Sequence, residues 1–175
     1  AKTYWSILLA QFHNSKTKTA MKMKTLLALL FALSTAIPAV AQQSLDVMVD
    51  REIASLVSTY KMLHAAPELS HREEKTSAFF AMQLRALGFT VTEHIGKYDR
   101  PGFTGYGVVA VMKNGDGPTV LVRTDLDGLP VEEKTGLPYA STVKAKNDAG
   151  QDVGVMHACG HDIHMTSMIG TAKVL

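Results

Sequence analysis

The chain has 175 residues, of which 46% are hydrophobic and 19% are charged, values typical of a globular protein with an apolar core. Its formal charge of +2 is unevenly distributed, because residues 1–41 contain five lysines and no acidic residue. The remainder has 13 basic and 16 acidic residues, a net charge of 13 − 16 = −3. The basic character therefore belongs to the leader, and the composition argues against a nucleic-acid partner.

The leader predicts a targeting segment. Met21 to Lys24 is a basic start, Leu26 to Leu33 is an unbroken apolar run, and Ala39-Val-Ala41 is a small-residue cleavage pattern. This order is typical of a secretory signal peptide, and the apolar run is shorter than the ~20 residues that span a bilayer. A buried helix is the alternative interpretation.

Three segments follow from this interpretation. Residues 1–20 precede the natural start and are interpreted as a non-native upstream segment, and residues 21–41 as the signal peptide. Residues 42–175 are then the mature chain. We expect a periplasmic or secreted protein without a stable membrane anchor.

Two helices are predicted at the start of the mature chain. Leu45 to Leu63 has apolar residues at helical spacing, and Pro67 ends that pattern. Ser70-His-Arg-Glu73 has the spacing of a capping box that opens a second helix, and Gly88 is expected to end it.

Extended segments are predicted after Gly88. Phe89 to Glu93 alternates like a strand, and Tyr106 to Met112 is apolar and β-branched. Asn114-Gly-Asp-Gly117 then predicts a tight hairpin that leads into a strand at Thr119 to Val122. A phosphate-binding loop is the rejected alternative, because no Lys-Ser/Thr follows the glycines.

Two aspartates follow the last of these strands. Asp125 and Asp127 are two residues apart, so in extended conformation their side chains point the same way. Sites in open α/β sheets form at the carboxyl ends of strands, although a plain turn at Asp127-Gly128 is the alternative. Further along, we expect Glu132 to Lys134 to be solvated, residues 144–150 to form a polar loop, and residues 153–156 to form a short strand.

Residues 156–165, MHACGHDIHM, contain three histidines and the chain's only cysteine. In an exported protein a lone cysteine has no disulfide partner, so Cys159 should be buried, metal-bound or nucleophilic. In a turn, Cys159 and His161 can face the same side, because Gly160 tolerates unusual dihedral angles. Thiolate and imidazole are favoured ligands of zinc and similar ions. Asp162 and His164 are available to orient those ligands, and Asp162 also to cap a following helix.

Other interpretations of this cluster are weaker. A zincin motif requires glutamate after the first histidine, and a dithiol redox site requires a second cysteine. A cysteine nucleophile paired with histidine and a purely structural cluster remain as alternatives.

Three segments resemble the M20 metallopeptidase family, in its amidohydrolase branch of aminoacylases, hippurate hydrolases and auxin-conjugate hydrolases: His64-Ala-Ala-Pro-Glu-Leu-Ser70, Arg123-Thr-Asp-Leu-Asp-Gly-Leu-Pro130 and Met156-His-Ala-Cys-Gly-His-Asp-Ile-His164. The resemblance implies an α/β fold, namely a three-layer zinc-aminopeptidase-like catalytic domain with a mixed sheet. It also implies hydrolysis of the amide bond of a small N-acyl amino acid or peptide, with two divalent ions (zinc or manganese), by a homodimer.

The same resemblance implies roles for individual residues. Cys159 and His161 would be metal ligands, and Asp127 would be the catalytic aspartate beside the metals. Asp125, Asp162 and His164 would support these groups. The family's general-base glutamate, further ligands and dimerisation domain follow the last motif, so we expect the amino-terminal part of a longer enzyme, truncated at its carboxyl end and inactive alone. The alternatives are a dipeptidase or carboxypeptidase of the same family, or a non-catalytic metal-binding chain.

Overall fold

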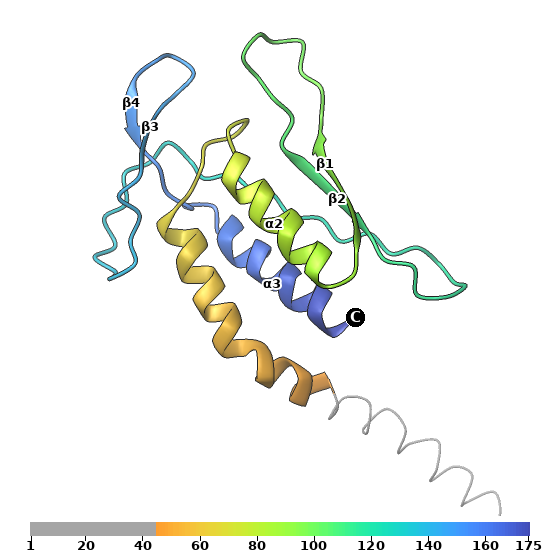
Figure 1. The fold of residues 1–175 in the computed structure, drawn as a ribbon. Helices are drawn as coiled ribbons and strands as arrows, with labels where there is room; N and C mark the ends of the chain where they lie inside the picture. The colour runs from red at the N-terminus through yellow and green to blue at the C-terminus, as the bar shows by residue number, and fades with distance from the viewer. Residues whose placement is uncertain (1–44) are drawn as a thin grey trace, which may run out of the picture. The chain divides into compact units, whose positions relative to one another are not determined.

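A computed structural model describes residues 45–175, so the predicted signal peptide and its cleavage site lie outside the described residues. The chain divides into two units at Met48, and the strands, α2 and α3 belong to the second unit. The described elements confirm the predicted α/β class (Figure 1). In chain order they are a helix that covers residues 45–65, α2 (Glu74–Ala86), β1 (Thr90–Ile95), β2 (Gly107–Val111), β3 (Lys144–Lys146), β4 (Asp152–Gly154) and α3 (His161–Val174). Among residues 45–175, no helix is long and apolar enough to cross a membrane.

The start of α2 differs from the prediction. Glu73 occupies the cap position without a side-chain hydrogen bond, so the predicted capping box with Ser70 is wrong. The carboxylate of Glu68 caps the helix instead, because it accepts hydrogen bonds from the amides of Lys75 (3.2 Å) and Thr76 (2.8 Å). The physical reason is the turn at residues 69–72, which separates Ser70 from the first turn of the helix.

The end of α2 is as predicted. Gly88 adopts φ +91°, a conformation that glycine adopts without the steric cost of a Cβ atom. Its amide donates to the carbonyl of Arg85 (3.0 Å), and the amide of Phe89 donates to the carbonyl of Leu84 (3.1 Å). These two bonds form a Schellman motif, which satisfies carbonyls that the helix leaves free.

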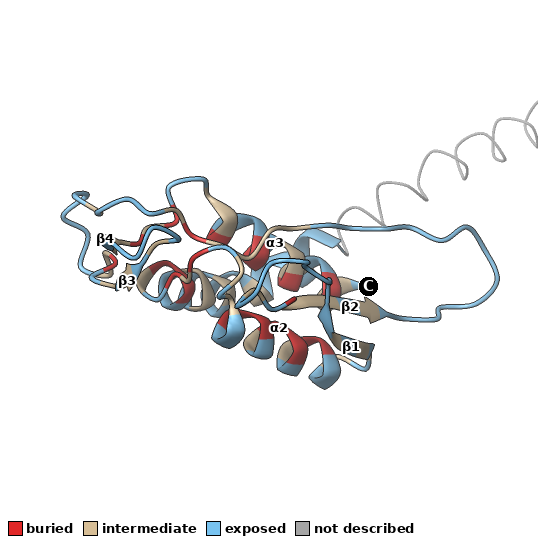
Figure 2. Ribbon diagram, turned by 90° about the horizontal axis from the view of Figure 1, so that it is seen from above, coloured by how far each residue is buried: buried red, intermediate tan, exposed pale blue. Residues whose placement is uncertain are grey.

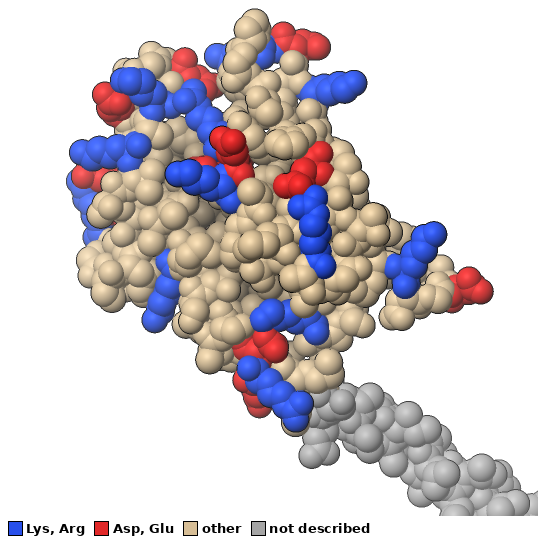
Figure 3. Space-filling view, in the orientation of Figure 1, with Lys and Arg blue, Asp and Glu red and all other residues tan. Residues whose placement is uncertain are grey.

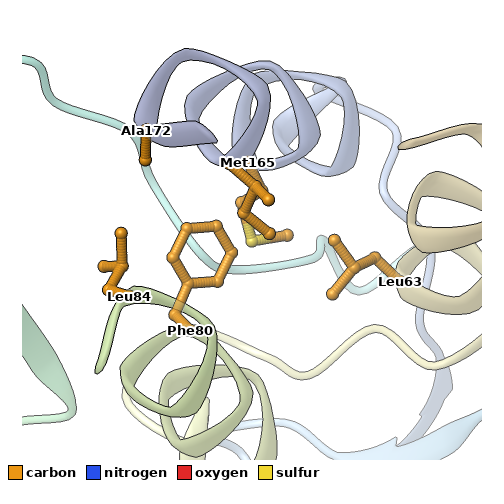
Figure 4. Packing of buried hydrophobic residues seen from close by; sticks show 6 residues of the cluster. Leu63, Phe80, Leu84, Met165 and Ala172 are labelled. Atoms are coloured by element: carbon orange, nitrogen blue, oxygen red, sulfur yellow. The ribbon is translucent and has the colours of Figure 1, made fainter. Parts of the chain in front are cut away.

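The apolar core lies where the helices face one another. Phe80 and Leu84 of α2 point toward Met165 and Ala172 of α3, and Leu63 of the first helix closes the side of the cluster (Figure 4). The outward surfaces of α2 and α3 are exposed (Figure 2). Burial of such side chains stabilises the fold by about 1.5–3 kcal/mol each.

The strands form two separate antiparallel pairs, β1 with β2 and β3 with β4. The predicted hairpin between β2 and residues 119–122 is wrong, because β2 pairs with the preceding strand in the register Thr90↔Val111. Residues 118–122 form no strand, and the side chains of Val120 and Leu121 are 81% and 89% exposed. An apolar, β-branched pattern identifies an extended segment but not its partner, and the local antiparallel pairing with β1 prevails.

The predicted polar loop at residues 144–150 is also corrected. Its first three residues form β3, which pairs with β4 in the register Ala145↔Val153. The side chain of Asn147 accepts hydrogen bonds from the amides of Ala149 and Gln151 (3.0 Å each) and organises the connecting turn. On the face drawn in Figure 3, basic and acidic side chains are interspersed.

Candidate metal centre

The three sequence motifs meet at one place in the fold. Leu69 and Gly128 form an isolated parallel bridge, and Leu129 and Met156 form an antiparallel one. The amide of Gly128 donates to the carbonyl of Glu68 (2.7 Å), and Leu129 and Met156 exchange two backbone hydrogen bonds of 2.8 and 3.0 Å. Segments far apart in the sequence are thereby fixed side by side.

Gly128 is required at this junction because there is no room for a side chain. A Cβ atom at Gly128 would lie 2.8 Å from the Cβ atom of Pro67 and 3.1 Å from Cγ1 of Val155. Both distances are below ordinary van der Waals contact. The glycine therefore allows the first and third motifs to approach the second.

His161 is the first residue of α3 and follows a turn closed by the hydrogen bond from the Gly160 amide to the His157 carbonyl (3.1 Å). Gly160 adopts φ +77°, as the sequence predicted for the residue between Cys159 and His161. The Nδ1 atom of His161 lies 2.9 Å from the carbonyl oxygen and 3.0 Å from the carboxylate of Asp127. Donation from Nδ1 fixes the tautomer in which Nε2 carries a free lone pair.

The free nitrogen of His161 faces a second carboxylate. Its Nε2 lies 3.9 Å from Oδ2 of Asp125, whose other oxygen accepts a hydrogen bond from Arg123 (2.6 Å). Two ligands of one tetrahedral zinc ion lie about 3.4 Å apart, so small movements would let both hold the same ion. The two aspartates therefore lie on opposite sides of the imidazole ring, Asp127 at Nδ1 and Asp125 at Nε2.

The thiol of Cys159 is exposed, which removes burial from the three explanations that the sequence left open. Imidazole, carboxylate and thiolate are all ligand types that zinc accepts, and the imidazole here is oriented through Nδ1. Within residues 45–175, however, no group of three or more histidine, cysteine, aspartate or glutamate side chains is arranged to hold an ion. The described residues therefore do not form a complete ion site by themselves.

Asp162 has partners other than the residues around His161. It is 2% exposed, and its Oδ2 atom lies 2.7 Å from Nδ1 of His64, while Oδ1 accepts the amide of Ile163 (2.9 Å). The predicted capping role is wrong, because Gly160 occupies the cap position and Asp162 lies inside the first turn. His164 is exposed, and its ring centroid lies 6.0 Å from that of His161.

Glu133 completes a buried network around His64, so its predicted place on a solvated surface is wrong. Its carboxylate side chain is fully buried and lies 3.0 Å from Nε2 of His64. It also accepts hydrogen bonds from the Thr135 hydroxyl and the Ser141 amide. These partners replace water around the carboxylate, so Glu133 can be buried although its neighbours in the sequence are charged.

The pKa values in this network shift in opposite directions. Burial lowers the pKa of His64, but hydrogen bonds to Glu133 and Asp162 outweigh burial and raise it above its ordinary value. Burial raises the pKa of Glu133, but hydrogen bonds from Thr135, His64 and Ser141 outweigh it and lower the value. The network therefore favours an imidazolium between two carboxylates.

His157 has the opposite surroundings. It is 4% exposed, and both of its ring nitrogens lack a hydrogen-bond partner. Burial lowers the pKa of His157 below its ordinary value. Unpaired buried polar atoms are rare, and each costs about 1–3 kcal/mol relative to a satisfied one.

His64 and Glu133 are residues of this region for which sequence reasoning predicted no site role. His64 opens the first motif, where its position after an apolar helix was the available signal. Glu133 had no signal, because its neighbours are charged and its partner His64 is 69 positions away.

The motifs that meet at this site also match known proteins. The model of peptidase family M20/M25/M40 matches residues 121–175. N-acetyl-L-cysteine deacetylase of Bacillus subtilis is 40% identical over 121 residues, which cover 69% of this chain and 25% of the relative. Thermostable carboxypeptidase 1 of Saccharolobus solfataricus is 39% identical over 127 residues, which cover 71% of this chain and 28% of the relative.

A solved structure is similar as well. It is the YXEP protein of Bacillus subtilis, a dinuclear metal binding peptidase from the M20 family, with a TM-score of 0.55 and 34% sequence identity. The match covers 74% of this chain and 31% of that one. The chain thus spans between about a quarter and a third of the length of these relatives.

Proposed function

We propose that the chain belongs to peptidase family M20/M25/M40 and contributes to the two-metal centre of an amidohydrolase that cleaves N-acyl amino acids. The observation that carries the proposal is the placement of His161, with Nδ1 on Asp127 and Nε2 toward Asp125. The similarity to a dinuclear metal binding peptidase supports two divalent ions, zinc or manganese.

The proposed ligands are Cys159 and His161, with Asp125 beside the free nitrogen. Asp127 holds the imidazole in the tautomer and orientation that bind a metal. When bound, the ions supply Lewis-acid polarisation of the amide carbonyl and a water of lowered pKa. Arg123 holds the carboxylate of Asp125 through one oxygen and leaves the other toward His161.

The proposed substrate is an N-acyl amino acid, which is supported by the similarity to a deacetylase of N-acetyl-L-cysteine. Carboxypeptidase activity on a peptide is the second candidate, supported by the similarity to a carboxypeptidase. Parallel assays with acetylated amino acids and with dipeptides separate the two. Homodimerisation of the whole protein and its export, with a mature chain that begins at Gln42, are part of the same proposal.

A cobalt(II) titration of the chain tests the metal site. Cobalt(II) occupies the same kinds of ligand sets as zinc, and thiolate coordination produces a charge-transfer band in the near ultraviolet. We expect this band in the wild-type chain and its loss in Cys159→Ala, with the affinity lowered more than about 100-fold. Wild-type binding without the band, or unchanged binding by Cys159→Ala, would contradict the assignment of Cys159.

The 175-residue chain itself is expected not to turn over substrate. In residues 45–175 the candidate donors are not arranged to hold an ion, and the general base that the family resemblance places after the last motif would contribute about 10²–10⁴ in rate. Release of free amino acid from acetylated donors, with zinc or manganese added, is the measurement. Metal-dependent release well above a Cys159→Ala control would overturn this expectation.

A further inference from the structure

The turn that carries Cys159 is attached to the rest of the fold on both sides. On its amino-terminal side, Met156 exchanges two hydrogen bonds with Leu129. On its carboxyl-terminal side, the first turn of α3 has no side-chain cap, since Gly160 occupies the cap position. Another group must hold that second side.

The carboxylate of Asp162 holds the first turn of α3 through its two oxygens. Oδ1 accepts the amide of Ile163 at 2.9 Å, inside the first turn of α3. Oδ2 accepts from Nδ1 of His64 at 2.7 Å, across 98 positions of sequence. His64 therefore reaches the first helical turn through Asp162, one residue after His161.

The other nitrogen of His64 is anchored by a buried carboxylate. Nε2 lies 3.0 Å from Glu133, whose side chain is fully buried and also held by the Ser141 amide at 2.5 Å. The Ser141 hydroxyl in turn donates to the carbonyl of Val155 at 2.7 Å. This series of hydrogen bonds thus connects His64 to Val155, in the strand segment that precedes the turn.

The ring of His64 is also fixed by its aromatic neighbours. Its centroid lies 5.5 Å from that of Tyr60 and 5.4 Å from that of Tyr139. With 5% of its surface exposed, it has little freedom to change rotamer. Because the ring of His64 is held in place, its hydrogen bond also holds the carboxylate of Asp162 in place.

We propose that His64 is a positioning residue of the metal site, which acts through Asp162 to hold the first turn of α3 and thereby the His161 ring against Asp127. This inference rests on the proposed metal site, and it adds a residue that does not touch the ion. Groups that orient metal ligands are typically worth 10- to 100-fold in metal affinity.

Two conservative variants separate the two hydrogen bonds of His64. The amide of asparagine lies where Nδ1 of histidine lies, and the amide of glutamine lies where Nε2 lies. His64→Asn therefore keeps the bond to Asp162 and loses the one to Glu133, and His64→Gln does the reverse. A merely structural residue would show similar losses in both variants.

The measurements are cobalt(II) affinity and amide hydrogen exchange of the full chain, well below its unfolding temperature. We expect His64→Gln to lose about tenfold in cobalt affinity and to exchange the Ile163 and His164 amides at least tenfold faster. Exchange at Ile169, within α3, should stay at the wild-type rate. His64→Asn, which keeps the bond to Asp162, should lose clearly less than His64→Gln in both measurements, and His94→Gln at an exposed histidine should resemble the wild type.

Each outcome supports or overturns the proposal. Equal losses in the Asn and Gln variants, or faster exchange along all of α3, would overturn it in favour of general stabilisation. Unchanged exchange at Ile163 and His164 in His64→Gln would overturn it as well. If the wild-type chain binds no cobalt, the proposed metal site fails, whereas hydrogen exchange still tests the positioning of α3.

Discussion

Two buried histidines, His64 and His157, have opposite surroundings. His64 is 5% exposed and has a carboxylate at each ring nitrogen, whereas His157 is 4% exposed and has a partner at neither. The first site is complete within the chain. The second has unused hydrogen-bonding capacity beside the proposed metal ligands, and such capacity in a native fold is typical of a functional region rather than of a stabilising one.

Replacement of His64 by leucine should give the largest loss of stability. His64→Leu keeps an apolar side chain of similar size but leaves Glu133 and Asp162 buried without their shared cation. Removal of one partner of a buried ion pair costs about 3–5 kcal/mol. Urea unfolding at neutral pH measures the loss, and a change below 1 kcal/mol, on the order of an exposed pair, would mean that the network contributes little.

Glu133→Gln should have an intermediate effect and has a matched control in the chain. The variant keeps the shape but removes the charge that faces His64, so we expect a loss of about 1–3 kcal/mol. The neighbouring Glu132 is exposed, and Glu132→Gln should change the free energy of unfolding by less than about 0.5 kcal/mol. Equal effects at the two positions would show that Glu133 is not buried in solution.

His157→Leu should act in the opposite direction from His64→Leu. Leucine removes two unpaired polar atoms from a buried position, so stability should be unchanged or should rise by about 1 kcal/mol. The same thermal or urea experiment, run beside His64→Leu, makes the comparison direct. A loss as large as that of His64→Leu would reveal a partner of His157 that stabilises the folded chain.

The smallest expected effect is the pH dependence of the His64 contribution. The pKa of His64 is raised in the folded state, so its stabilisation is fully present below the unfolded value of about 6.5 and is lost as the pH rises through the folded value. The pKa of Glu133 is lowered, so its contribution is present above about 4.3 and is lost as the pH falls through its folded value. The stability difference between wild type and His64→Leu should therefore be greatest near pH 5–6. A stability difference that keeps growing above pH 8 would contradict this pH dependence.

Local patterns predicted the local structure, and distant partners account for what they did not predict. Helical periodicity and the glycine after it were sufficient for α2, because both act within a few residues. The exposed segment at residues 118–122 has a strand-like sequence. Strand pairing, however, depends on which other segment lies beside it in the fold, and the periodicity of a sequence does not specify that partner. At the site, the spacing of Cys159 and His161 predicted a turn with Gly160 between them, and that turn is present. Their roles as ligands stay a prediction.

The burial of Glu133 illustrates the limit most clearly. A charged residue between two other charged residues is expected in water unless a specific partner compensates its burial. That partner, His64, is 69 positions earlier, and the ring is in place only because the first helix packs against α3. The error was therefore one of tertiary context rather than of propensity.

The bond between His64 and Asp162 also has a consequence for how the chain is made. The two residues are 98 positions apart, so at a synthesis rate of about 5–20 residues per second a ribosome adds Asp162 roughly 5–20 s after His64. During that interval the first helix and α2 exist without α3, and the apolar side chains of Leu63, Phe80 and Leu84 have nothing to cover them. Until α3 emerges, the nascent chain consequently exposes apolar surface of the kind that chaperones bind.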